Sequence, residues 1–302
     1  MTVTQHRVAS GSITLHAVTE GNPDSPPLVL VHGYPDNHHV WDKVVKALAP
    51  DFFLIRYDVR GAGLSDKPMR TREYGLDRLS DDLEAVVDEL IPGQKFHLAA
   101  HDWGSIQSWE SVTAGPLKQR ILSYTSISGP CLDHVGFWLR EEGLNFARGG
   151  TMKVVRQLAS SWYVFLFQIP VVPEIIWQLG LDRIWPKMLR AREDIHDAEF
   201  SEFQKNDGRF GVKLYRANFL PRLLKPSIRR ADCPVQLIIP KRDRYVRGQL
   251  FGQLTQWTGK LTRQELDAPH WAPLTAPEMV AGTIRNFALT AAVSNVAEET
   301  ST

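Results

Sequence analysis

The feature that most constrains this chain is an apolar run that turns directly into a helix. Residues 96–100 are typical of a short buried strand, and residues 106–112 can form a helix. The turn between them has Asp102 near its centre, with the small residues Ala100 and Gly104 on either side. A strand that enters a helix through such a strained turn is typical of a nucleophile elbow, whose central side chain stands above the sheet.

The central residue of this turn predicts the chemistry. A carboxylate such as Asp102 is already ionised, so it needs no base to act as a nucleophile. It can displace a leaving group at a saturated carbon and form an ester with the substrate. The alternative is that Asp102 is a loop residue that caps the next helix, and the rest of the chain must decide between the two.

Composition excludes several classes of protein. The 302 residues are 43% apolar and 23% charged, which is an ordinary globular balance. The 35 basic and 34 acidic residues nearly cancel, so net charge does not favour a nucleic-acid partner. The two cysteines, Cys131 and Cys233, do not suggest a disulfide scaffold.

Targeting and membrane-spanning segments are not predicted either. The N-terminus is polar and alternating, unlike a signal peptide. The most apolar stretch, residues 162–177, is interrupted by Gln168, Pro170, Pro173 and Glu174, so it does not reach the run of about 18 apolar residues that a span needs. We therefore expect a cytoplasmic protein without a membrane span.

Strand and helix patterns alternate along the first part of the chain. Residues 3–9 and 12–19 predict an antiparallel hairpin. Apolar runs then predict buried strands, and amphipathic spacing such as that of residues 76–90 predicts helices between them. This alternation predicts an α/β fold with a mostly parallel sheet and helices on both faces. The predicted strands are 28–31, 52–57, 96–100 and 121–127.

A helical block interrupts this alternation. After Gly129 the chain is rich in Trp, Leu and Arg with helical periodicity. Strand patterns resume at residues 235–239 and 261–266, before a last helix. We therefore divide the chain into an α/β core, an inserted helical cap and a tail predicted to be disordered. The core is 1–129 and 227–292, the cap is 130–226 and the tail is 293–302.

His270 is the histidine best placed to hydrolyse an ester on Asp102. It lies between the last predicted strand and the last helix, and such loops lie at the carboxyl edge of the sheet with Asp102. Asp243 follows the preceding predicted strand and is our choice for the carboxylate that orients His270. Asp133 is a rival, and Asp267 is too close in sequence to His270. The chain order of nucleophile, acid and histidine supports catalysis.

Two backbone N–H groups are expected to stabilise the negative charge of the intermediate. Trp103, the residue after the nucleophile, supplies one, and Tyr34 in the loop after the first buried strand supplies the other. Gly33 lets that loop turn, and Pro35 stiffens it. His32 is then a structural hydrogen-bonding residue rather than an acid or base.

No cofactor or metal site is predicted. The glycine-rich segment 60–66 lacks the third glycine and the immediate helix of a dinucleotide-binding fingerprint. His38 and His39 stand near Asp36 and Asp42, but no second cluster supports a metal site.

Two features of the predicted cap are ambiguous. The basic stretches 182–192 and 222–230 could indicate an anionic surface partner, but we prefer a solvated cap face. The apolar segment 162–177 either packs the cap on the core or lines the roof of a pocket. We expect it to line the pocket, because burying a long apolar chain there gains several kcal/mol at about 25 cal/mol per Å².

Together these motifs resemble the α/β-hydrolases of the epoxide hydrolase type. The resemblance covers nearly all of residues 10–292. It implies the α/β-hydrolase fold, with an eight-stranded, mostly parallel sheet, an inserted helical cap and an aspartate nucleophile. It rests on His-Gly-Tyr-Pro at 32–35, Arg-Gly-Ala-Gly-Leu-Ser-Asp at 60–66, His-Asp-Trp-Gly at 101–104, Asp243 and His270.

The resemblance also implies a role for two cap tyrosines, which hydrogen-bond the epoxide oxygen in this family. Tyr163 fits the first, because it stands five residues before Gln168 and seven before Pro170. Tyr215 looks like the second. The implied reaction opens a small lipophilic epoxide to a vicinal diol through an aspartyl ester.

Two other functions stay open. Haloalkane dehalogenases share the Asp-Trp pair, and the indole N–H of Trp103 could hold a halide, although many of them carry Asn or Glu where Tyr34 stands. A non-catalytic ligand-binding protein on this fold is the alternative from another class. The chain also resembles the N-terminal part of actinobacterial proteins in which such a domain precedes a short-chain dehydrogenase, so a dehydrogenase domain could follow in a longer parent chain.

Overall fold

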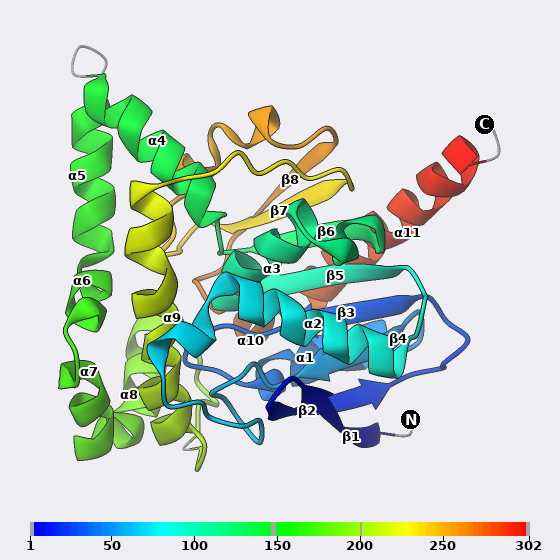
Figure 1. Ribbon diagram of the computed structural model, residues 1–302, viewed down its shortest axis with the longest axis horizontal. Helices are drawn as coiled ribbons and strands as arrows, with labels where there is room; N and C mark the ends of the chain where they lie inside the picture. The colour runs from blue at the N-terminus through cyan, green and yellow to red at the C-terminus, as the bar shows by residue number, and fades with distance from the viewer. Residues whose placement is uncertain (1–2, 146–148, 200, 300–302) are drawn as a thin grey trace.

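A central sheet of eight strands organises the molecule in the computed structural model, which describes residues 3–145, 149–199 and 201–299 (Figure 1). The strand order is β1-β2-β4-β3-β5-β6-β7-β8. The β1–β2 and β2–β4 pairs are antiparallel and the other pairs are parallel, which confirms the predicted α/β-hydrolase fold. The strands are β1 (Val3–Ser10), β2 (Ile13–Glu20), β3 (Pro27–Val31), β4 (Phe53–Tyr57), β5 (Phe96–His101), β6 (Ile121–Ile127), β7 (Val235–Pro240) and β8 (Leu261–Leu266).

Two hydrophobic cores lie on opposite faces of this sheet. All residues of β3 and β5 are buried, as expected of parallel strands between two helical layers. Along β3, Val29 and Val31 belong to one core, whereas Leu28 and Leu30 belong to the other. The alternation arises because successive side chains of a strand point to opposite faces.

Helices cover both cores. Leu83 of α2 and Trp109 of α3 belong to the first core, and Val44 of α1 and Ile284 of α11 belong to the second. The spacing that predicted α2 arises because residues three and four apart share one face of a helix. These helices are α1 (Asp42–Leu48), α2 (Leu76–Leu90), α3 (Trp103–Thr113), α10 (Ala272–Thr275) and α11 (Pro277–Glu299), with short 3-10 segments at η1 (His38–Trp41), η2 (Thr71–Tyr74), η3 (Pro116–Gln119), η6 (Gly248–Phe251) and η7 (Leu254–Gln256).

The cap lies to one side of the sheet, on the left in Figure 1. In the described part of the chain between β6 and β7, the regular elements are helices. They are α4 (Leu132–Leu144), α5 (Gly150–Ser160), α6 (Trp162–Gln168), α7 (Val172–Ile176), η5 (Trp177–Leu181), α8 (Asp182–Glu193) and α9 (Gln204–Leu224).

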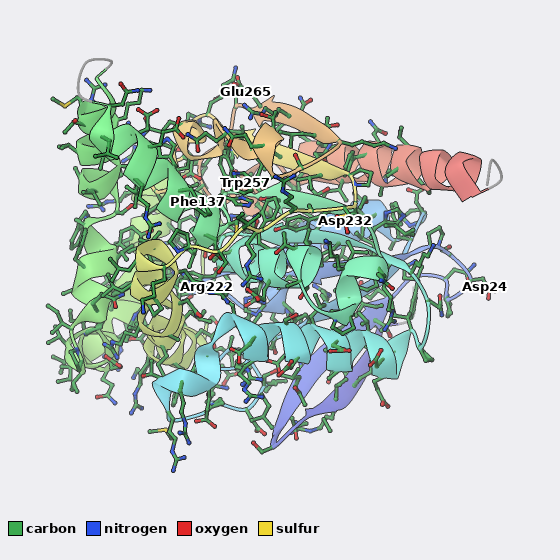
Figure 2. All side chains as sticks on the ribbon, turned by 45° about the horizontal axis from the view of Figure 1, so that its top comes forward. Asp24, Phe137, Arg222, Asp232, Trp257 and Glu265 are labelled. Atoms are coloured by element: carbon green, nitrogen blue, oxygen red, sulfur yellow. The ribbon has the colours of Figure 1, made fainter. Side chains whose placement is uncertain are left out.

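The two ends of the cap are fixed to the core by different contacts (Figure 2). Phe137 of α4 stacks on Trp257, which precedes β8, with ring centroids 5.2 Å apart. Arg222 of α9 forms an ion pair of 2.8 Å with Glu110 of α3. A stacked ring pair and a part-buried ion pair therefore hold the base of the cap against the core.

The prediction of a disordered tail from residue 293 is wrong for most of that segment. Helix α11 continues through it and ends at Glu299. The segment contains Ala and Glu, which favour helix, and no Pro or Gly that would stop one. Residues 300–302 lie outside the described part of the chain.

Candidate active site

Asp102 lies at a strained elbow between β5 and α3. Its backbone φ is 51° and its ψ is −122°, a region that residues with a side chain rarely adopt. The elbow also needs a glycine at position 104, because a Cβ there would lie 2.3 Å from the carbonyl oxygen of Val31. The sequence expectation of a tight strand–helix turn is confirmed, and its strain is of the kind that accompanies functional sites.

The two carboxylate oxygens of Asp102 have different neighbours. Oδ2 accepts a hydrogen bond of 2.8 Å from the backbone N–H of Tyr34. Oδ1 lies 3.5 Å from Nε2 of His270. Trp103 is the first residue of α3, and the first four N–H groups of a helix have no partner within it. The backbone of Gly33 passes so close that a Cβ would lie 2.5 Å from Oδ2.

His270 is hydrogen-bonded to Asp243 on its other side. Nδ1 of His270 lies 2.9 Å from Oδ2 of Asp243, and Oδ1 of Asp243 accepts the backbone N–H groups of Tyr245 and Val246. Burial alone would lower the pKa of His270, but the charge of Asp243 and its contact with Asp102 raise that pKa well above 6.5. Burial would raise the pKa of Asp243, but the charge of His270 lowers it.

The rival carboxylates lie elsewhere. Asp133 is buried at the start of α4, where it accepts the backbone N–H of Ser227 and pairs with Arg222 and Arg229. Asp267 is exposed and pairs with Arg242. Of the three candidates, the structure brings Asp243 to His270.

Both cap tyrosines face the same cavity as Asp102 and His270. Tyr163 comes from α6 and Tyr215 from α9, and their ring centroids are 6.0 Å apart. Burial and the nearby charge of Asp102 raise the pKa of both phenols well above 10. Both groups therefore stay protonated at neutral pH and can donate hydrogen bonds.

The cavity has a volume of about 510 Å³ and mostly apolar walls. A smaller cavity of about 100 Å³ shares Asp102, Tyr163, Tyr215 and Tyr245 with it, so the two spaces meet at the elbow. Besides Tyr163, the segment that was ambiguous in the sequence supplies six residues to the walls of the larger cavity. They are Trp162, Leu166, Phe167, Pro173, Ile176 and Trp177.

Sequence reasoning missed the roles of two carboxylates beside His270, one buried and one partly buried. Glu193 of α8 accepts the backbone N–H of His270 at 3.1 Å, and burial raises the pKa of Glu193. Asp36 accepts the indole N–H of Trp271 at 2.8 Å, and burial raises the pKa of Asp36 to about 7. Asp36 directly follows the His-Gly-Tyr-Pro motif, which could have indicated it, whereas Glu193 has no local signal.

The histidines of the first loop are structural. His32 accepts the backbone N–H of Val59 through Nε2 and contacts the carbonyl of Gly33 through Nδ1, as expected. Burial lowers the pKa of His32 to about 4.

The four residues weighed as a metal site have different hydrogen-bond partners. His39 pairs with Asp42, whereas Nδ1 of His38 and of His16 lie 2.7 Å and 3.0 Å from the carboxylate of Asp58. The same carboxylate accepts the backbone N–H groups of His38 and Leu64. Its lone pairs are therefore used in hydrogen bonds.

Known sequences resemble this chain along most of its length. The family described as "alpha/beta hydrolase fold" matches residues 26–158. A protein of Mycobacterium tuberculosis named "Probable oxidoreductase EphD" is 35% identical over 283 residues, which are 89% of this chain and 46% of that protein. "Epoxide hydrolase 1" of Caenorhabditis elegans is 25% identical over 91% of this chain and 68% of that protein. The chain thus spans about half the length of its mycobacterial relative.

Solved structures show the same fold. The epoxide hydrolase of Bacillus megaterium in complex with an inhibitor has a TM-score of 0.77 at 20% identity, covering 93% of this chain and 99% of that one. Epoxide hydrolase VrEH1 from Vigna radiata has a TM-score of 0.72 at 19% identity, covering 94% and 97%. The family match and these structures show that the chain has the α/β-hydrolase fold. Its sequence is similar to proteins named as epoxide hydrolases along most of its length.

Proposed function

We propose that the chain hydrolyses lipophilic epoxides to vicinal diols through an ester on Asp102. The observation that carries the proposal is the position of the Asp102 carboxylate. One oxygen accepts a backbone N–H from Tyr34, and the other faces His270 across 3.5 Å. Two phenols, Tyr163 and Tyr215, line the cavity in front of it.

The first step breaks the ring. Oδ1 of Asp102 attacks a ring carbon, and the electron pair of the breaking C–O bond passes to the epoxide oxygen. An alkoxide is a poor leaving group, so Tyr163 and Tyr215 stabilise it and one of them transfers a proton to it. The raised pKa of the phenols fits this role, because it keeps the proton in place until negative charge develops.

The second step hydrolyses the ester. Nε2 of His270 takes a proton from water, whose oxygen attacks the carbonyl carbon of the esterified Asp102. Negative charge then develops on Oδ2, which the N–H groups of Tyr34 and Trp103 stabilise. The bond between the carbonyl carbon and Oδ1 then breaks, the departing alkoxide takes the proton of the new carboxylic acid and leaves as the diol, and Asp102 is again a carboxylate. The proton on the imidazolium, which Asp243 stabilises, returns by way of solvent to the phenolate that the first step left.

Dehalogenation is the second candidate, and one observation favours it. The indole N–H of Trp103 is buried at the elbow, and the hydroxyl of Tyr215 lies close to it. Such an N–H could hold a departing halide. The two phenols that line the cavity argue against dehalogenation. A halide leaves as a stable anion, so its departure needs no proton donor.

One experiment tests both candidates. The protein is incubated with a series of terminal epoxides and with haloalkanes of matched chain length, and diol and halide are measured. We expect diol from the epoxides and no halide. A single turnover in ¹⁸O-labelled water should leave the label in Asp102 and give unlabelled diol, because the diol oxygen comes from the carboxylate. Halide release without diol would establish the dehalogenase instead.

We also propose that a dehydrogenase domain follows this domain in a longer parent chain. The support is that the mycobacterial relative is named an oxidoreductase and that the match covers 46% of it. Intact-mass measurement of the protein isolated from its natural source tests this proposal.

A further inference from the structure

One side of α5 and α6 is apolar and exposed. The two helices are separated by Ser161 and form the edge of the cap that lies farthest from the sheet (left in Figure 1). Their exposed apolar residues recur in steps of three or four, which places them on one side of each helix. These residues are Met152, Val155, Leu158, Trp162, Phe165 and Ile169.

The next helices extend this surface. Their exposed apolar side chains belong to α7, η5, the start of α8 and the turn before α7, and α7 contacts α6. Leu179 is 83% exposed and Trp162 is 63% exposed, although large apolar side chains usually lie inside. We call both sets together the apolar cap face. The second set is Val171, Val172, Ile175, Ile176, Leu179 and Ile184.

Most exposed charges on the helices of the apolar cap face are positive, although Lys153 pairs with Glu142. Between positions 150 and 193, the exposed charged residues are all basic. The acidic residues of this range add little negative charge to the surface. Glu174 pairs with Arg216, and Asp182 and Glu193 are buried. The chain as a whole has a formal net charge of only +1, so this positive surface is local. The basic residues are Lys153, Arg156, Arg183, Lys187, Arg190 and Arg192.

Residues of the apolar cap face also line the two cavities. Trp162 and Ile176 are exposed on the apolar cap face and also line the larger cavity. Leu158 and Phe165 are likewise exposed and line the smaller one. The apolar cap face and the walls of the cavities are therefore continuous at these four residues.

We propose that the apolar cap face docks on an anionic lipid bilayer. Apolar side chains fit the boundary between headgroups and acyl chains, and basic side chains beside them fit the lipid phosphates. Among the described residues, no single helix is both long and apolar enough to cross a bilayer. The helix pair Trp162–Gln168 and Val172–Glu193 is apolar and long enough only when taken together, and its two parts meet at an angle of 101°. We therefore place this face on the membrane surface. Docking does not depend on the reaction, whereas delivery of an epoxide from the bilayer rests on the proposed function.

Sedimentation of the full chain with vesicles tests the docking. Vesicles of phosphatidylcholine alone are compared with vesicles that also contain phosphatidylglycerol. We expect the protein to sediment with the anionic vesicles and to be released by salt, because charge attraction at a surface is screened within about 10 Å at 0.1 M salt. Failure to bind anionic vesicles at low salt would overturn the proposal.

Two triple variants separate the apolar and the charged contributions. The apolar triple variant carries Val155→Ser, Ile169→Ser and Leu179→Ser. Its partition coefficient onto anionic vesicles should fall by at least about tenfold. The charge triple variant carries Arg156→Gln, Arg183→Gln and Lys187→Gln. Its partition coefficient onto anionic vesicles should fall about 100-fold, since each basic residue near an anionic surface contributes about fivefold. None of these six side chains lines either of the two cavities described above.

Matched substitutions on the core serve as controls. Val3→Ser with Met69→Ser and Met279→Ser removes equally exposed apolar side chains, and Lys43→Gln with Arg78→Gln and Lys241→Gln removes three basic charges. Both should bind vesicles like the parent, and equal losses in these controls would contradict the proposal. The parent protein could instead form a dimer in lipid-free solution that the apolar triple variant does not form. That result would assign the apolar cap face to contact with a second copy of the chain and overturn membrane docking.

Turnover of a water-soluble epoxide distinguishes the two proposals. The apolar triple variant should open such an epoxide at the parent rate and lose the faster turnover of a long-chain epoxide presented in anionic vesicles. If no epoxide is turned over at all, the proposed function fails, but the vesicle-binding result still stands by itself.

Discussion

The backbone N–H of Tyr34 donates a hydrogen bond of 2.8 Å to Oδ2 of Asp102 and so makes the two oxygens of that carboxylate different. Oδ2 occupies the position that the oxyanion must occupy later. Oδ1 faces His270 Nε2 at 3.5 Å and is the oxygen that we expect to attack the substrate. The elbow thereby assigns one oxygen of Asp102 to each step of the proposed reaction.

Replacing His270 by Gln should stop the reaction at the ester. Asp102 needs no base to attack, whereas water needs one to attack the ester carbonyl. Intact-mass spectrometry should show the mass of the substrate added to the variant, and peptide mapping should place it on Asp102. The double change with Asp102→Ala is the control and should gain no mass. Normal turnover by His270→Gln would contradict the assignment.

Removing the two cavity phenols should slow ester formation. Tyr163→Phe and Tyr215→Phe keep the rings and remove the donors, so each should reduce the rate by roughly tenfold or more, and the pair should nearly abolish it. Single-turnover quench experiments measure this rate.

Tyr34→Phe is the matched control for the phenol variants. It removes the hydroxyl that accepts the indole N–H of Trp177, but it keeps the backbone N–H that holds Asp102. This variant should lose stability and change ester formation much less. If the Tyr163 and Tyr215 double variant opens epoxides at the parent rate, the role of the two phenols is refuted.

Ester formation should lower the pKa of His270. In the free enzyme the charges of Asp243 and Asp102 both raise this pKa. The ester on Asp102 is uncharged, so one of the two contributions is lost in the intermediate. Hydrolysis needs neutral His270, so its rate should rise with pH around a midpoint below the pKa that proton NMR measures for His270 in the free enzyme. Coincident values would show that Asp102 does not influence His270.

Glu193 should position the loop of His270 from the cap. Glu193→Ala removes the acceptor of the His270 N–H, so ester hydrolysis should slow more than ester formation. Glu193→Gln keeps an acceptor for the His270 N–H, so it should retain much of the rate of ester hydrolysis. It also removes a negative charge near His270, so the midpoint of the pH–rate profile of hydrolysis should move to lower pH. A purely structural role would change thermal stability in both variants and leave the pH profile unmoved.

The cavity should favour long apolar substrates. Its aromatic walls gain about 25 cal/mol per Å² of apolar surface that they bury, so kcat/KM should rise with the chain length of the epoxide. Leu181→Trp adds volume to the wall and should reduce kcat/KM for long epoxides while sparing short ones. A flat dependence on chain length in the parent protein would contradict the lipophilic assignment.

Sequence patterns predicted the core because its elements depend on local interactions. The buried runs of β3 and β5, the spacing of α2 and the small residue at position 104 each reflect contacts within a strand, a helix or a turn. The same local logic failed at the C-terminus, where polar residues suggested disorder and α11 continued to Glu299.

The sequence by itself determined the elbow at Asp102, the order of the chemical groups and the alternation that builds the sheet. Only the tertiary structure decided that Asp243 rather than Asp133 contacts His270, and that Glu193 reaches the same loop from the cap. It also decided which cap residues line the cavity and which form the apolar cap face. Periodicity and turn chemistry act over a few neighbouring residues, whereas these contacts join residues distant in sequence and depend on how the whole chain packs.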